Sequence, residues 1–325
     1  MSEEKAPPLR DRLLVHAARA LAGALSRLPR ERGLALARGL GRWWTRLRGP
    51  RTGDARRNLR IAFPEWGEAE RQRLLERTLA NLGAGLIEFA TMSRLEAGVL
   101  RGLADVEGLE HLEGARRTSP CGGVVVLTAH YGAWELLVSI MATYGLPIAV
   151  VHRARDNPLF DRVIGLWRES SGVELLARGS AARAGLRALR EGRILAMTLD
   201  QNCSRGEGVF VPFLGRLACT RDGPARIAMH TGAPVVPIFI ERIGASGRHR
   251  VRIEPPLALA PAGEDREAAV AENVGRMAAA VERAIRRAPE QWVWIHRRWR
   301  TQPRGEPRPY PRRTVQRKLL PISLV

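Results

Sequence analysis

The sequence predicts an α/β protein whose central, largely parallel sheet is flanked by helices. Short runs of apolar β-formers alternate with amphipathic helical segments from about residue 109 onward, and this alternation is typical of a parallel sheet. A length of 325 residues with 45% hydrophobic content supports a sizeable core. The first 50 residues follow another pattern, in which basic residues flank apolar stripes.

Each expected strand is a run of four to seven residues that is rich in Val, Ile and Leu. The runs are residues 123–129, 148–152, 173–176, 194–199, 235–240 and 249–253. Each expected helix carries apolar side chains three or four residues apart. The helices are residues 68–93, 133–144, 157–170, 181–191, 224–231 and 265–287. Residues 109–114 lead into the first strand, and residues 51–64 are interpreted as a basic connector.

We expect three regions along the chain. Residues 1–50 form N-terminal amphipathic, membrane-associating helices, residues 51–303 form the α/β domain, and residues 304–325 form a basic tail. The tail is rich in Pro and Arg, which is typical of extended, poorly ordered chain.

The charge of the chain is strongly positive. A net charge of +20 and a pI near 11.4 come almost entirely from arginine and favour an anionic partner, whether nucleic acid, anionic lipid or an acidic protein. Residues 13–28 and 34–44 carry apolar stripes between basic flanks, and the second stretch ends on Trp43 and Trp44. This pattern is typical of a helix in a membrane interface, or of one packed on its own domain. Neither stretch is a secure membrane span, so the sequence leaves open whether the N-terminal helix spans the membrane or lies on it.

The three cysteines, Cys121, Cys203 and Cys219, form no CxxC pair and are odd in number. They indicate neither a disulfide framework nor a zinc site, and we expect small core residues in a reducing compartment.

A histidine and a glutamate with four residues between them, His130 and Glu135, stand where a strand, a sharp turn and a helix start meet. On one continuous helix, residues five apart lie roughly 140° around the axis and cannot touch. The pair can therefore meet only if His130 precedes the helix and Glu135 lies in its first turns. A carboxylate bonded to one imidazole nitrogen leaves the other free as a general base. Metal ligation is disfavoured because the His pair of zinc helices is absent.

Other polar side chains follow strands whose carboxyl ends should open onto the same cleft. Arg153 follows the 148–152 run, and Asp200 and Gln201 follow the 194–199 run. Residues 208–213 contain Gly and Pro, which argue against a central strand, and Phe210 and Phe213 are interpreted as lining an acyl channel or packing in the core. The tryptophans at 292, 294 and 299 are interpreted as a closing strand, an interfacial belt or core residues.

Six boxes in order resemble the lysophospholipid acyltransferase superfamily and, within it, the lipid A biosynthesis lauroyl and myristoyl acyltransferase family. They lie at residues 130–135 (the HxxxxE box), 152–159, 199–201, 208–215, 231–237 and 291–299. The Phe-Pro-Glu-Gly-Thr-Arg box of the glycerol-phosphate acyltransferases is missing, which favours the lipid A family. Ala133 departs from the pattern, because most relatives have Asn before the Trp of the first box.

The resemblance implies transfer of a fatty acyl chain from a thioester on acyl carrier protein or CoA to a hydroxyl of a lipid A precursor, without a further cofactor or a metal. His130 would take the hydroxyl proton, and Glu135 would orient the ring. The residues expected to bind the acceptor are Tyr131, Gly132, Trp134, Arg153, Arg168, Asp200, Gln201, Gly208, Val209 and Phe210. The expected partners are a membrane lipid, the acidic acyl carrier protein and an anionic surface, at the cytoplasmic face of the cell inner membrane.

Two alternatives stay open. An acyltransferase of the same superfamily could act on another glycolipid or on a lysophospholipid. A nucleic-acid-binding protein would share the basic pI, but the chain lacks a recognisable recognition helix, RNP motif or zinc finger. Acyl chain length, the donor, the acceptor hydroxyl and the oligomeric state are not set by the sequence.

Overall fold

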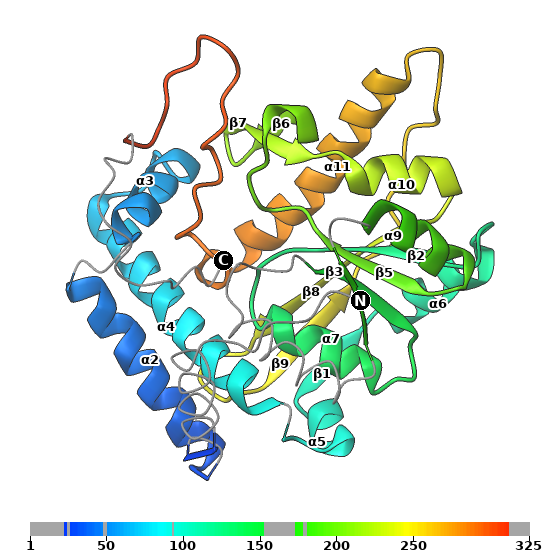
Figure 1. Cartoon of the computed structure of the whole chain (residues 1–325). Coiled ribbons are helices and arrows are strands. Elements are labelled where there is room, and N and C mark those ends of the chain that lie inside the picture. The colour runs from blue at the N-terminus through cyan, green and yellow to red at the C-terminus, as the bar shows by residue number, and fades with distance from the viewer. Residues whose placement is uncertain are drawn as a thin grey trace, which may run out of the picture.

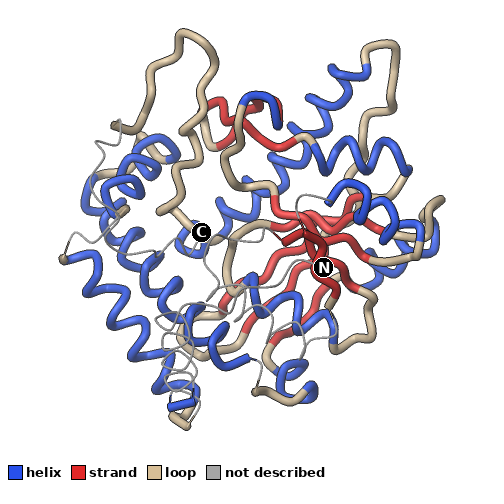
Figure 2. The backbone as a smooth tube through the Cα atoms, in the orientation of Figure 1, coloured by secondary structure: helices blue, strands red, loops and turns tan. Residues whose placement is uncertain are grey.

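A seven-stranded sheet lies at the centre of the computed structural model, with helices on both faces (Figures 1 and 2). The structure describes residues 23–24, 27–47, 51–92, 94–152, 173–177 and 181–311. The strand order is β1-β9-β8-β2-β5-β3-β4. The strands are β1 (Ala104–Glu107), β2 (Val124–Thr128), β3 (Ile148–His152), β4 (Glu174–Ala177), β5 (Ile194–Thr198), β8 (Val235–Arg242) and β9 (His249–Ile253). Neighbouring strands run parallel except β8 and β9, which confirms the predicted fold class.

Alternate residues of the central strands face two separate cores. Val125 and Leu127 of β2 pack with residues of α9, α10 and α11, whereas Val124 and Val126 pack with residues of α6 and α7. The helices are α2 (Arg30–Arg46), α3 (Thr52–Ala62), α4 (Glu68–Met92), α5 (Ala97–Gly102), α6 (Leu109–Thr118), α7 (Trp134–Ala142), α9 (Ala181–Arg190), α10 (Gly223–Thr231) and α11 (Arg266–Arg287). Apolar side chains thus cover both faces of the sheet, as its continuous hydrophobic runs require.

Three expectations about local structure were wrong. The predicted basic connector is helix α3, whose buried Ala55, Leu59 and Ala62 form one stripe. Arginine is a good helix former, so the charges hid a short amphipathic helix. Strand β1 was missed, and the stretch from residue 109 is helix α6 rather than a lead into a strand. The predicted helix at 157–170 lies outside the described residues, as does most of the one at 13–28.

Strands β6 (Gly208–Phe213) and β7 (Arg216–Arg221) form a separate antiparallel hairpin, which agrees with the expectation that residues 208–213 are not a central strand. Cys219 of β7 and Cys203, which precedes the hairpin, are both buried, with their sulfur atoms 3.4 Å apart as free thiols. Both are core residues, as predicted.

Helix α2 lies unusually close to helix α4 because both carry glycine at the crossing (Figure 1). A methyl group at Gly41 would overlap the backbone of Leu79, and one at Gly83 would overlap the carbonyl oxygen of Ala37. One face of α2 is therefore packed on its own domain. The opposite face exposes an apolar stripe at i, i+4, i+7 and i+11. The residues are Leu36, Leu40, Trp43 and Leu47, each more than half exposed.

A buried carboxylate connects α2 to the sheet. Glu88 of α4 is 1% exposed and contacts Arg30 of α2 at 2.6 Å, Arg242 of β8 at 2.7 Å and His249 of β9 at 3.0 Å. Burial would raise the pKa of Glu88, but the hydrogen bond from His249 and the charge of Arg242 lower it to about 2. We name these four residues the Glu88 cluster.

The C-terminal tryptophans belong to the core. Trp292, Trp294 and Trp299 are at most 1% exposed, so of the three interpretations core packing holds, and an interfacial belt does not. The tail begins as a packed segment: the Tyr310 hydroxyl donates to Asn58 Oδ1 of α3, and Tyr310 is 7% exposed. The tail beyond residue 311 lies outside the described residues.

Candidate active site

The candidate site forms where β2 and β5 end side by side. These strands are parallel neighbours in register, with Thr128 opposite Thr198. His130 follows the first strand and Asp200 follows the second, so the sheet itself brings the two side chains together. This is the carboxyl edge at which α/β sheets bind ligands.

Asp200 holds His130 through both of its oxygens. His130 Nδ1 lies 2.9 Å from Oδ1, and the backbone N–H of His130 donates to Oδ2 at 3.0 Å. Asp200 is 2% exposed, and burial would raise its pKa, but the charge and hydrogen bonds of His130 and the indole of Trp292 lower it to about 2. An ionised carboxylate can only accept, so the imidazole carries its proton on Nδ1.

The second ring nitrogen faces an amide. Gln201 Nε2 lies 3.2 Å from His130 Nε2, and because the amide nitrogen can only donate, Nε2 is the acceptor in this pair. The His130 side chain is 18% exposed. A neutral imidazole with an accepting Nε2 at a partly open surface is what a general base requires.

The turn after His130 depends on Gly132. Its φ is +61°, its N–H donates to the carbonyl of Gln291 at 2.9 Å, and a methyl group at this position would overlap the carbonyl oxygen of Ile240. The glycine thus lets the turn pass directly over β8. Helix α7 begins two residues later, which places Glu135 in its first turn and His130 outside it, as the spacing predicted.

Glu135 and its neighbours complete the first box. The Glu135 carboxylate accepts from the Trp134 indole at 3.0 Å, and the Trp134 ring lies edge-on to His130 with centroids 5.5 Å apart. Ala133 is the N-cap of α7 and offers no capping side chain, a position where Asn is preferred. Alanine at position 133 therefore leaves α7 without a side-chain cap at its N-terminus.

The other predicted acceptor residues fall in different places. Gln201 and Trp134 lie beside His130, and Asp200 lies beneath it as its partner. Tyr131 is 1% exposed and donates to Glu241, and burial raises the pKa of its hydroxyl. Gly208, Val209 and Phe210 lie half-buried on β6, and their contact with the acceptor stays a prediction.

Phe213, the second candidate for an acyl channel, is 1% exposed between Trp292 and Trp299 and packs in the core. Arg153 and Arg168 lie outside the described residues.

Sequence reasoning missed the C-terminal segment beneath the site. Trp292 Nε1 donates to Asp200 Oδ2 at 2.9 Å, and Arg298 Nη1 donates to the Gln201 carbonyl at 3.1 Å. His296 Nε2 accepts from the backbone N–H of Asn202 at 3.0 Å, and burial lowers its pKa to about 3, so this histidine is neutral. The sequence signal for this segment was the dense run of Trp, His and Arg at residues 292–299, which is unlike the merely basic N-terminal region.

An imidazole held by a carboxylate at the carboxyl edge of an α/β sheet is an arrangement that can take a proton from a hydroxyl or thiol. Residues 11–301 match the family described as bacterial lipid A biosynthesis acyltransferase. The chain therefore belongs to this family, as the resemblance indicated, and it is an O-acyltransferase.

Relatives from Escherichia coli (strain K12) agree over most of the chain. The lipid A biosynthesis lauroyltransferase is 30% identical over 275 residues, which are 84% of this chain and 86% of that protein. The myristoyltransferase is 29% identical over 296 residues, 91% of this chain and 89% of that protein. The palmitoleoyltransferase is 29% identical over 253 residues, 78% of this chain and 79% of that protein.

Proposed function

We propose that this enzyme moves a fatty acyl chain from a carrier thioester to a hydroxyl of a lipid A precursor, with His130 as the general base. The observation that carries the proposal is the contact of His130 Nδ1 with Asp200, which leaves Nε2 as the acceptor at a partly exposed surface. The family and its relatives, named for lipid A acylation, support the acceptor class.

The proton path follows from this tautomer. The acceptor hydroxyl takes the place of the Gln201 amide beside Nε2 and gives its proton to that nitrogen as its oxygen attacks the thioester carbonyl. The carbon–sulfur bond then breaks, and the thiolate leaves with the proton from the imidazolium. A positioned base of this kind contributes roughly 10²- to 10⁴-fold in rate.

Two carboxylates are candidates for orienting the ring. Asp200 is supported by its two contacts with His130, and Glu135 is supported by the HxxxxE spacing and by its place in the first turn of α7. We propose that both act on the imidazole, with Asp200 fixing Nδ1 and Glu135 stabilising the positive charge.

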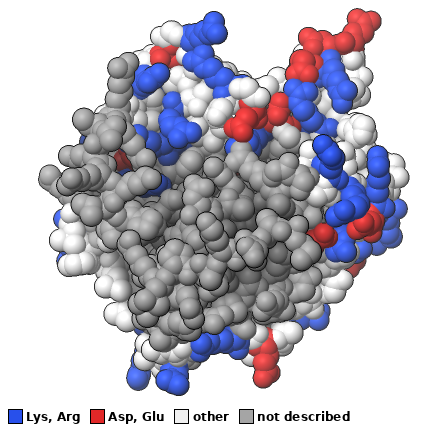
Figure 3. Space-filling model, viewed as in Figure 1, with Lys and Arg blue, Asp and Glu red and all other residues white. Residues whose placement is uncertain are grey.

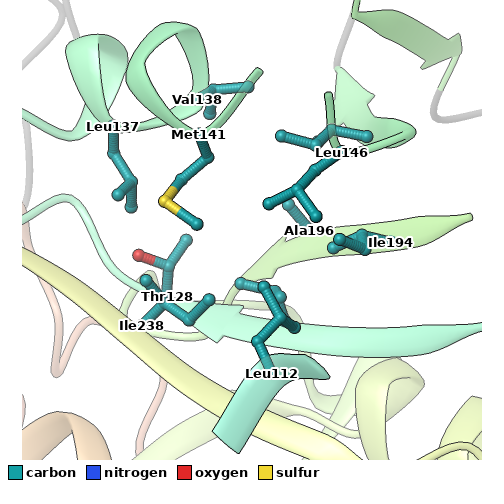
Figure 4. Close-up of a pocket in the computed structure, with 11 residues that line it drawn as sticks. Leu112, Thr128, Leu137, Val138, Met141, Leu146, Ile194, Ala196 and Ile238 are labelled. Carbon is teal, nitrogen blue, oxygen red and sulfur yellow. The ribbon is translucent and has the colours of Figure 1, made fainter. Parts of the chain in front are cut away.

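An apolar cavity beside the site supports a fatty acyl donor. It lies between α7 and the sheet and is lined by aliphatic side chains together with Thr128, two residues before His130 (Figure 4). Leu137 and Met141 reach into it from α7, and Leu146 and Ile194 lie across it. Burying a chain there would gain roughly 0.8 kcal/mol for each CH₂ group. The free volume of the cavity is about 30 Å³, so we propose that an acyl chain enters here as the side chains of α7 move apart.

The positive charge of the chain supports an anionic donor, which acyl carrier protein and CoA both are. Lys and Arg side chains outnumber Asp and Glu on the described part of the face in Figure 3, in keeping with the net charge of +20. Such a field attracts an acidic carrier protein and anionic lipid alike.

The test is transfer by the purified full chain. Acyl carrier protein or CoA bearing one acyl chain is mixed with a lipid A precursor, and mass spectrometry follows the acceptor. We expect its mass to rise by one acyl group, and the donor that reacts faster identifies the carrier. An unchanged precursor together with acylation of another glycolipid or of a lysophospholipid would move the proposal to that acceptor. Loss of one acyl chain from lipid A in cells lacking the gene is the matching result in vivo.

We also propose that the enzyme lies at the cytoplasmic face of the inner membrane through α2. None of the helices in the described part of the chain is long and apolar enough to cross a bilayer. The exposed apolar stripe of α2, flanked by arginines and ending near Trp43 and Trp44, is the pattern of an interfacial helix.

Replacing Leu40, Trp43 and Leu47 together with serine should weaken binding to anionic phospholipid vesicles by about 100-fold or more, since each side chain buried in lipid contributes about 1.5 to 3 kcal/mol. Vesicle flotation measures the effect. The control replaces Val99 and Leu217, which are exposed elsewhere on the surface, with serine and should bind as the wild type does. Equal binding by both variants would place the anchor outside α2.

A further inference from the structure

We propose that Trp292 is a positioning residue for the reaction: its indole N–H holds the Asp200 carboxylate in the one orientation that fixes His130. This inference rests on the proposed function, because it concerns the partner of the proposed base. The indole nitrogen lies 2.9 Å from Asp200 Oδ2, and Trp292 is 1% exposed.

The contacts divide between the two carboxylate oxygens. Oδ2 accepts from Trp292 Nε1 and from the backbone N–H of His130, while Oδ1 faces His130 Nδ1. Rotation of the carboxylate would break the contact with the ring. Trp292 and the His130 backbone therefore pin Oδ2 from two directions and leave Oδ1 aimed at the imidazole.

Trp292 is itself held rigidly. Its ring packs against Phe213 at 5.6 Å, Trp294 at 4.6 Å and Trp299 at 6.5 Å between centroids. Its backbone forms a bridge with Tyr131, and the preceding carbonyl, of Gln291, accepts from Gly132. One short segment thus holds the carboxylate through a side chain and the catalytic turn through its backbone.

The electrostatic consequence has a definite sign. The charged and titratable groups that act on Asp200 from the packed elements are His130, His296 and Arg298. Removing the indole donor frees the carboxylate to rotate, and the protonated His130 ring then loses its stabilising contact with Oδ1. A base that protonates less readily stays active to lower pH.

The experiment compares Trp292→Phe with Trp294→Phe. Trp294 lies in the same core at 0% exposure and donates its indole N–H to the Pro289 carbonyl, so this control also removes one ring and one hydrogen bond. We expect Trp292→Phe to lower kcat by about 10- to 100-fold with little change in KM. The acid limb of its pH profile should move down by roughly 0.5 to 1 pH unit. Trp294→Phe should lose comparable thermal stability and keep kcat and the pH profile.

Equal kcat in the two variants, or a lower kcat with an unmoved acid limb, would overturn the proposal. NMR of ¹⁵N-tryptophan-labelled protein gives a second measurement that does not depend on the folding of Trp292→Phe. In Asp200→Asn the indole resonance of Trp292 should shift and that of Trp294 should not, and an unshifted Trp292 resonance would also overturn the proposal. Failure of the proposed function has a separate signature, because His130→Ala would then retain transfer whatever Trp292→Phe does.

Discussion

Replacing His130 with alanine should abolish most acyl transfer while the fold and vesicle binding stay intact. The expected loss is roughly 10²- to 10⁴-fold, because the acceptor hydroxyl loses the group that we propose takes its proton. The side chain is 18% exposed, so its loss also removes packing against Trp134 and must be separated from the loss of the base. Transfer is measured by mass of the acylated acceptor, and the melting temperature verifies the fold. Near-normal turnover would remove the mechanism.

Amide variants of Asp200 and Glu135 distinguish the roles of the two carboxylates. Asp200→Asn should lower kcat between about 10²- and 10⁴-fold, because an amide donor facing Nδ1 would force the proton onto Nε2 and occupy the base. The HxxxxE spacing predicts a large loss for Glu135→Gln too. Asp105→Asn, in an exposed ion pair on β1, is the control and should be neutral. Full activity in Asp200→Asn would contradict the Nδ1 contact, and in Glu135→Gln it would remove Glu135 from the reaction.

Gly132→Ala should destabilise the protein by more than about 3 kcal/mol. A left-handed backbone costs an L residue about 1 to 2 kcal/mol, and here the added methyl group would also overlap the Ile240 carbonyl. Either β8 or the catalytic turn must then move, so the surviving folded fraction should also lose activity. A thermal melt followed by fluorescence measures the loss.

Gly145→Ala provides the matched control for the glycine. Gly145 has φ +71°, and an added methyl group there meets no atom within 4 Å. It should carry the backbone cost alone, about 1 to 2 kcal/mol. Equal melting temperatures for Gly132→Ala and Gly145→Ala would show that the close approach of the turn to β8 does not contribute to the loss of stability.

Runs of apolar β-formers predicted most of the sheet, because its central strands are buried on both faces. The predicted ranges 148–152 and 249–253 match β3 and β9 to the residue, although β9 alternates between buried and partly exposed residues. Strand β1 was missed because it lies at the sheet edge and reads Ala-Asp-Val-Glu, with half of its residues polar. Helix α3 was missed because half of its buried residues are polar, namely Thr52, Asp54 and Asn58, and three of its other positions are arginines.

The central residues of the site could be predicted because the ends of apolar strands can be located in the sequence. His130, Asp200 and Gln201 each follow a predicted strand, and parallel strands bring such ends to one edge. The contact between Trp292 and Asp200 joins positions 92 residues apart, and no local pattern marks it. A tryptophan in an apolar run looks the same whether its indole N–H meets a carboxylate or a carbonyl, as the contrast with Trp294 demonstrates.

The Glu88 cluster continues without a break to the catalytic turn. Arg242, bound to Glu88, exchanges both of its backbone hydrogen bonds with the Gln291 side chain. The Gln291 carbonyl in turn accepts from Gly132. With α2 seated among lipid headgroups as proposed, these contacts would couple the position of α2 to the turn that holds His130. A displacement of α2 at the membrane surface would then reach the imidazole through hydrogen bonds alone.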